Sequence, residues 1–141
     1  MNRPTCFVDS VGWIAMLNVS DELYKKAENE YKRLMRSGFR FLTSTAVLNE
    51  VANALSKVKF RNSVVEFYKK LQESQRVEIV FIDENIWALG WDLYENRPDK
   101  EWSLTDCTSI VIMEKQGLID AFTNDKHFEQ AGFNAILRSS Q

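Results

Sequence analysis

Short runs of β-branched and aromatic residues alternate along this chain with longer segments whose apolar residues recur at helical spacing. The strand-like runs lie at residues 6–9, 41–43, 77–82, 119–123 and 135–137. The helical segments lie at about residues 10–17, 22–37, 46–57, 62–74, 84–94 and 104–116. Strands that alternate with helices form a parallel sheet with helices on both faces. The sequence therefore predicts an α/β fold built on a parallel five-stranded sheet.

Length and composition indicate one globular domain. The chain has 141 residues, enough to bury a core, and its 45% hydrophobic and 27% charged residues are close to the averages of soluble globular proteins. No linker, repeat or low-complexity tract divides it. We therefore expect a single domain over residues 1–141.

The N-terminal segment, the apolar runs and the cysteines indicate the cellular compartment. The N-terminal segment lacks the apolar stretch of a signal peptide, and no apolar run is long enough to span a membrane. Cys6 and Cys107 stand among apolar neighbours, which is typical of buried free thiols in a reducing compartment. We therefore expect a cytoplasmic protein without a membrane partner.

Four carboxylates stand at the ends of the apolar runs or a few residues beyond them. They are Asp9, Glu50, Asp106 and Asp125. Open α/β sheets build their sites at the carboxyl ends of the strands, so these acids are expected to converge. Like charges in a shared cleft repel one another, and a divalent cation resolves that conflict. An all-oxygen cluster favours Mg²⁺ or Mn²⁺, which indicates a metal-dependent nuclease or phosphotransferase.

Each acid also has an ordinary structural interpretation. Asp9 and Asp125 are suited to helix capping or turns, and Ser103 with Asp106 forms a capping-box pattern. Glu50 lies beside a buried apolar stripe, where an unpaired carboxylate is costly. The functional interpretation therefore rests on the set and not on any one acid.

Other sequence features are weaker. His127 is the only histidine, and it lies on a polar stretch where we expect it to be exposed. Asp83 is expected to cap the helix that contains Trp87. No phosphate-cradling glycine loop occurs. The net charge of −2 argues against a general nucleic-acid coat, although Lys57, Lys59 and Arg61 form a local basic cluster. That cluster is either part of an RNA path or a solvated helix face.

Four segments together resemble PIN-domain proteins, most closely the VapC-type toxins of prokaryotic toxin–antitoxin pairs. The segments are FVDSVGWIAMLN, TAVLNEVANAL, SLTDCTSIVIMEKQGL and DAFTNDKHFEQAGF, and the resemblance extends over residues 6–137. It implies an α/β/α sandwich in which the four acids form the catalytic and metal-binding quartet. Thr123 matches a polar position that supports the last acid. Ser10 falls within the first motif but one residue before the usual hydroxyl position, which is Val11 here.

The resemblance also implies an activity and partners. The activity is hydrolysis of RNA by water activated by Mg²⁺ or Mn²⁺, which leaves 5′-phosphate and 3′-hydroxyl ends. The partners are an RNA substrate and a cognate antitoxin protein. Two alternatives remain open from the sequence: a housekeeping PIN nuclease without an antitoxin, and a non-catalytic PIN module that binds RNA or protein.

The helical segment 84–94 carries two apolar stripes. Ile86, Leu89 and Leu93 form one, which we expect to face the core. Trp87, Trp91 and Tyr94 form the second, called the aromatic stripe below. Such a stripe is either a homodimer interface or is covered within the chain by the polar segment 96–101 and Trp102.

Overall fold

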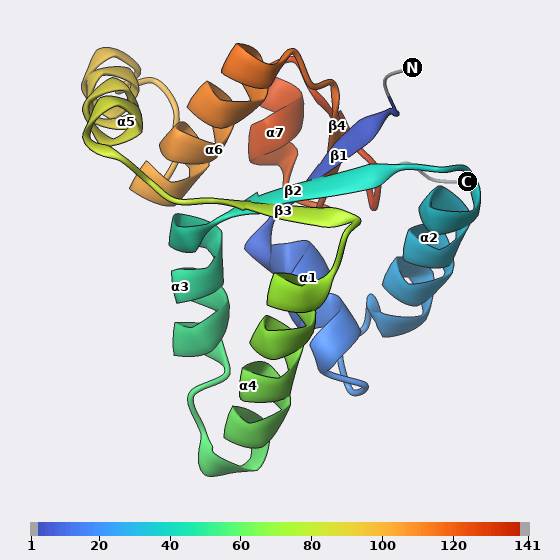
Figure 1. Cartoon of the computed structure of the whole chain (residues 1–141). Helices are drawn as coiled ribbons and strands as arrows, with labels where there is room; N and C mark the ends of the chain where they lie inside the picture. The colour runs from blue at the N-terminus through green and yellow to red at the C-terminus, as the bar shows by residue number, and fades with distance from the viewer. Residues whose placement is uncertain (1–2, 139–141) are drawn as a thin grey trace.

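The computed structural model describes residues 3–138; residues 1–2 and 139–141 of the expected domain lie outside the described part. Its strands form one sheet in the order β3-β2-β1-β4-β5, and every neighbouring pair is parallel (Figure 1). The strands are β1 (Thr5–Val8), β2 (Arg40–Ser44), β3 (Val77–Val80), β4 (Asp120–Phe122) and β5 (Asn134–Ala135). The predicted parallel five-stranded sheet is confirmed.

Helices cover both faces of the sheet. One face carries α1 (Ser10–Leu17), α2 (Tyr24–Arg36), α3 (Thr45–Ala54) and α4 (Val58–Glu73). The other carries α5 (Glu84–Asn96), α6 (Leu104–Gln116) and α7 (Lys126–Gln130), so the architecture is an α/β/α sandwich (Figure 1). Within residues 3–138, no helix combines the length and apolar character that crossing a bilayer requires.

The centre of the core is β1, whose Phe7 and Val8 are fully buried. The indole of Trp13 in α1 donates a hydrogen bond of 3.0 Å to Oγ1 of Thr43, which itself donates to the carbonyl of Val8. Gly12 allows α1 to approach β4, because a Cβ there would lie 2.5 Å from the carbonyl oxygen of Phe122. These contacts fix the chain on both sides of Asp9.

The boundaries of several elements differ from those predicted. Helix α3 ends at Ala54 and α4 begins at Val58, whereas the sequence predicted helices at 46–57 and 62–74. Helix α7 was not predicted, because its five residues are too few to show a periodic pattern, and it depends on the buried Phe128 and on an N-terminal cap. Cys6 and Cys107 are buried free thiols, as expected.

Helix α5 packs against α6. Gly90 is buried there, and a Cβ on it would lie 2.6 Å from the Cγ2 methyl of Thr108. Ile86 and Leu93 flank this contact and are half-buried, whereas Leu89 is 37% exposed. The prediction that Leu89 faces the core was therefore wrong, because α5 packs on one helix and not on the sheet.

The aromatic stripe is uncovered in this chain. Trp87, Trp91 and Tyr94 form successive edge-to-face contacts and remain about half exposed, at 50%, 45% and 47%. Trp102 is buried in a separate cluster with Cys107 and Ile110. Within the described residues, Trp102 therefore does not cover the stripe.

Candidate active site

The site forms where the order of the strands reverses. From the central β1 the chain proceeds to β2 and β3 on one side, and then returns to β4 and β5 on the other. Open α/β sheets place their sites at such a point, which here is the carboxyl ends of β1 and β4 and is called the acid crevice below. Asp9 directly follows β1 and Thr123 directly follows β4, so both residues lie at this end of the strands.

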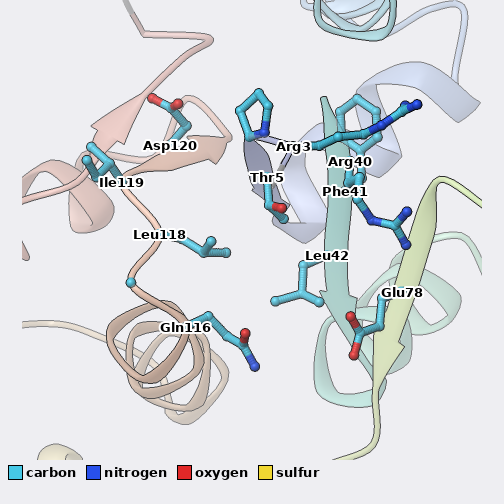
Figure 2. A pocket seen from close by; sticks show the side chains of 12 residues that line it. Arg3, Thr5, Arg40, Phe41, Leu42, Glu78, Gln116, Leu118, Ile119 and Asp120 are labelled. Carbon is cyan, nitrogen blue, oxygen red and sulfur yellow. The ribbon is translucent and has the colours of Figure 1, made fainter. Parts of the chain in front are cut away.

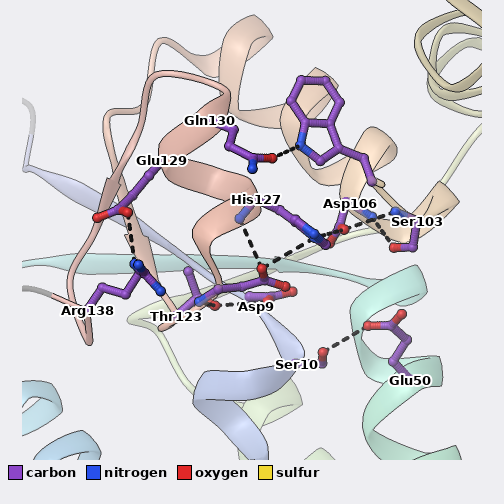
Figure 3. Close-up of polar contacts among 12 residues, drawn as sticks. Asp9, Ser10, Glu50, Ser103, Asp106, Thr123, His127, Glu129, Gln130 and Arg138 are labelled. Atoms are coloured by element: carbon purple, nitrogen blue, oxygen red, sulfur yellow. Dashed lines mark hydrogen bonds and ion pairs between the residues drawn. The ribbon is translucent and has the colours of Figure 1, made fainter. Parts of the chain in front are cut away.

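Asp9 is positioned by both strands. It is the N-cap residue of α1, but its side chain makes no capping hydrogen bond. Its Oδ2 instead accepts a hydrogen bond of 3.1 Å from the hydroxyl of Thr123, whose oxygen accepts the backbone N–H of Asp125 (Figure 3). Thr123 therefore links the first acid to the last.

Asp106 is held in the first turn of α6 by the predicted capping box. The hydroxyl of Ser103 accepts the backbone N–H of Asp106 at 2.9 Å, and Oδ2 of Asp106 accepts the backbone N–H of Ser103 at 3.0 Å. Capping leaves the carboxylate at the crevice, so one side chain is able to serve both roles.

His127 lies in the site, and the expectation that it is exposed was wrong. Its Nδ1 is 2.9 Å from Oδ2 of Asp106 and 3.3 Å from Oδ1 of Asp125, and its side chain is 20% exposed. The cause is α7: Oδ1 of Asp125 caps this helix by accepting the backbone N–H of His127 at 3.0 Å, which turns the imidazole toward α6 (Figure 3). An Asp two residues before a histidine was the available sequence signal.

Glu50 lies on the α3 side of the crevice. The hydroxyl of Ser10 donates a hydrogen bond of 2.8 Å to Oε1 of Glu50, which ties α3 to the start of α1 (Figure 3). Ser10 thus contacts an acid of the set although it stands one residue before the usual hydroxyl position.

The carboxyl group of Asp9 lies in an environment that disfavours its ionised form. The pKa of its carboxyl group is raised from 3.8 to about 7, chiefly by burial and then by the negative charges of Asp106 and, to a smaller extent, Glu50. Hydrogen bonds from the backbone of Ser10 and from Thr123 oppose the increase in pKa. An acid kept in a buried position beside a second acid is a feature of functional sites more often than of structural ones.

The donor groups are suited to a divalent cation. One ligand atom each from Asp106, Asp125 and His127 lies within 4.8 Å of the others. Asp9 and Glu50 are directed toward Thr123 and Ser10 in this arrangement and lie outside that group. Carboxylate oxygens are typical ligands of Mg²⁺ and Mn²⁺, and the imidazole adds a nitrogen that Mn²⁺ accepts more readily than Mg²⁺.

The basic cluster is remote from the acids. Lys57, Lys59 and Arg61 occupy the connection from α3 to α4 and the first turn of α4, at the end of α3 away from the sheet (Figure 1). Arg61 donates from Nε to the carbonyl of Ser56 at 2.7 Å, and Nζ of Lys59 lies 5.0 Å from the ring centre of Phe60. The structure does not bring these side chains to the acid crevice.

A cavity of about 670 Å³ opens at the amino ends of the strands, opposite the end at which the acids lie. Thr5, Arg40 and Asp120, the first residues of three strands, line it together with Glu78 and Gln116 (Figure 2). It is therefore separate from the acids at the carboxyl ends of the strands.

A parallel sheet between two helical layers, with carboxylates gathered where the strand order reverses, defines an α/β protein with an acidic site at its switch point. The chain belongs to the PIN-domain family, whose model matches residues 6–134. The resemblance inferred from the sequence is thereby confirmed.

Individual relatives agree with this assignment. The chain is 33% identical over 129 residues to the 23S rRNA-specific endonuclease VapC20 of Mycobacterium tuberculosis, and the match covers 90% of this chain and 94% of the relative. The crystal structure of VapC20, a Sarcin-Ricin loop cleaving toxin, superposes with a TM-score of 0.79 at 27% identity over 91% of this chain and 95% of that one. FitAcB from Neisseria gonorrhoeae shares the fold at 14% identity, with a TM-score of 0.61 and coverage of 92% and 95%.

Proposed function

We propose that this protein is a metal-dependent endoribonuclease and the toxin of a toxin–antitoxin pair. The observation that carries the proposal is the acid cluster: Asp9 is buried at the switch point beside Asp106, where its ionised form is disfavoured unless positive charge is added. The VapC20 relative, which spans nearly the whole chain, supports RNA as the substrate and ribosomal RNA as the first candidate to test.

The chain's own residues have separable roles in this proposal. Asp9, Asp106 and Asp125 would hold Mg²⁺ or Mn²⁺, with His127 beside them and Glu50 completing the quartet directly or through water. Thr123 and Ser10 orient Asp9 and Glu50 through the hydrogen bonds described above. When bound, the ion would supply the charge that stabilises a phosphodiester under attack and would lower the pKa of an attacking water. Orientation by second-layer hydrogen bonds commonly contributes 10- to 100-fold to such sites.

The first test is cleavage of ribosomal RNA by the purified protein. We expect cleavage in Mg²⁺ or Mn²⁺, none in excess EDTA, and recovery when Mg²⁺ is added beyond the chelator. A melting curve in EDTA serves as the control, because loss of activity by unfolding would mimic loss of the metal. Undiminished cleavage in EDTA by the folded protein would contradict the proposal.

We also propose that the protein forms a homodimer through Trp91 and Tyr94, the part of the aromatic stripe that does not line a cavity. Each residue of the stripe is about half exposed, and large exposed aromatic surfaces on a chain of this size are typical of interfaces. Sedimentation should give a dimer for the wild type at micromolar concentration and a monomer for Trp91→Glu. Asn85→Glu, which adds the same charge at an exposed position of α5 outside the stripe, should remain dimeric. A monomeric wild type would contradict this proposal.

A further inference from the structure

A second cavity, of about 550 Å³, is lined by residues that stand next to two of the acids in the sequence. It lies among the N-terminal parts of α3, α5 and α6, and six of the residues that line it are Thr45, Asn49, Trp87, Leu104, Thr105 and Thr108. We call it the side cavity. None of the acids discussed above lines it, so it is distinct from the proposed metal site.

The side cavity and the acids share two helices. Asn49 directly precedes Glu50 on α3, and Thr105 directly precedes Asp106 on α6. The cavity and two of the acids therefore lie along the N-terminal halves of the same two helices, α3 and α6.

The lining of the side cavity is suited to a base and not to a phosphate. No charged side chain is among its lining residues, which form a mixed polar and apolar wall. Asn49 is exposed, and its amide makes no hydrogen bond to another described residue, so both its donor and its acceptor are free. Half of the surface of Trp87 is exposed, and it stands in the first turn of α5, at the end of the aromatic stripe that borders this cavity.

These features match the way proteins recognise single-stranded RNA. Unpaired bases stack on aromatic side chains and form hydrogen bonds to amides and hydroxyls through their edges. An amide side chain carries both a donor and an acceptor and therefore distinguishes one base edge from another.

We propose that the side cavity binds the unpaired base of the nucleotide next to the cleaved phosphodiester, with Trp87 as its stacking surface and Asn49 as the residue that selects the base. This assignment rests on the proposed ribonuclease function and adds a determinant of cleavage sequence to it. Thr105 also lines the cavity and adds a hydroxyl group that is available to the same base.

The test uses a pool of single-stranded RNA with a randomised stretch, incubated in Mg²⁺, with cut positions mapped by sequencing. The wild type should prefer one base at a position flanking the cut. Asn49→Ala should still cut but lose about tenfold or more of that preference. Asn53→Ala is the matched control, because Asn53 lies one turn further along α3, is exposed, and does not line the cavity; it should retain the preference of the wild type.

Trp87 gives an independent measurement. Trp87→Ala should lower the cleavage rate about 5- to 150-fold across all sequences, the range expected for loss of base stacking, and Trp87→Phe should restore most of it. Melting and sedimentation of both variants exclude unfolding and dissociation as the cause.

The outcomes separate this inference from the proposed function. If the wild type cuts RNA but shows no base preference beside the cut, or if Asn49→Ala keeps that preference, the base site is wrong and the ribonuclease stands. If Trp87→Ala changes only the sedimentation of the protein, the cavity belongs to a protein interface and the inference is overturned. If the wild type cuts no RNA in either metal, the proposed function fails and this inference fails with it.

Discussion

Asp106→Asn should reduce RNA cleavage by about a hundredfold or more while the protein remains folded. The substitution preserves the volume of the side chain but removes a charge from the group formed with Asp125 and His127. Since altering residues that only orient a metal ligand costs about 10- to 100-fold, loss of a ligand charge should cost at least the upper end of that range. Initial cleavage rates in Mg²⁺, with melting curves of both proteins, measure the effect.

Asp83→Asn is the matched control for this variant. Asp83 is also an acid at the end of a strand, and it caps α5 as predicted, by accepting the backbone N–H of Ile86 at 2.8 Å. Asn is as good a capping residue as Asp, so cleavage and stability should both stay close to those of the wild type. Equal activity of the wild type and Asp106→Asn would remove Asp106 from the site.

The metal-free protein should lose stability as the pH rises from about 4 to about 7. The carboxyl group of Asp9 has a pKa of about 7 in the folded protein and 3.8 as its ordinary value, so in this interval the folded state holds a proton that the unfolded state has released. The free energy of unfolding therefore decreases by about 1.4 kcal/mol per pH unit from this group, and levels off above pH 7.

Asp9→Asn isolates that contribution, because the amide is neutral at every pH and still accepts the hydrogen bond from Thr123. In EDTA, the variant should be about as stable as the wild type near pH 4.5 and more stable by a few kcal/mol at pH 8. Added Mg²⁺ should stabilise the wild type more at pH 8 than at pH 5.5, because protons compete for the carboxylate. If the free energy of unfolding of the two proteins changes in parallel across this pH range, the pKa of Asp9 is not raised in the folded protein.

Much of the fold was predictable because its signals are local. The capping box of Ser103 and Asp106 and the left-handed Gly117 fix both ends of α6, and its observed bounds agree with the prediction. The first four strands were recognisable because each contains β-branched or aromatic residues in a short run between helices, whereas β5 has only two residues and neither is of these types. The placement of Asp9 and Asp106 near one another followed from the rule for the carboxyl ends of parallel strands.

The parts that were missed depend on contacts between distant segments. His127 reaches Asp106 only because the short helix α7 forms, stabilised by the buried Phe128 and the capping Asp125. A helix of five residues is too short to show a periodic pattern in the sequence. Leu89 was assigned to the core because helical spacing cannot show that Gly90 draws α5 close to a single neighbouring helix.

The chemistry of the product ends tests the central claim most directly. RNA cut by the wild-type protein in Mg²⁺ should carry 5′-phosphate and 3′-hydroxyl ends, because an activated water, and not the 2′-hydroxyl of the RNA, attacks phosphorus. Ligation of the products to adapters that require a 5′-phosphate, compared with ligation after kinase treatment, measures this. Products that end in 2′,3′-cyclic phosphates with 5′-hydroxyl partners would contradict the account.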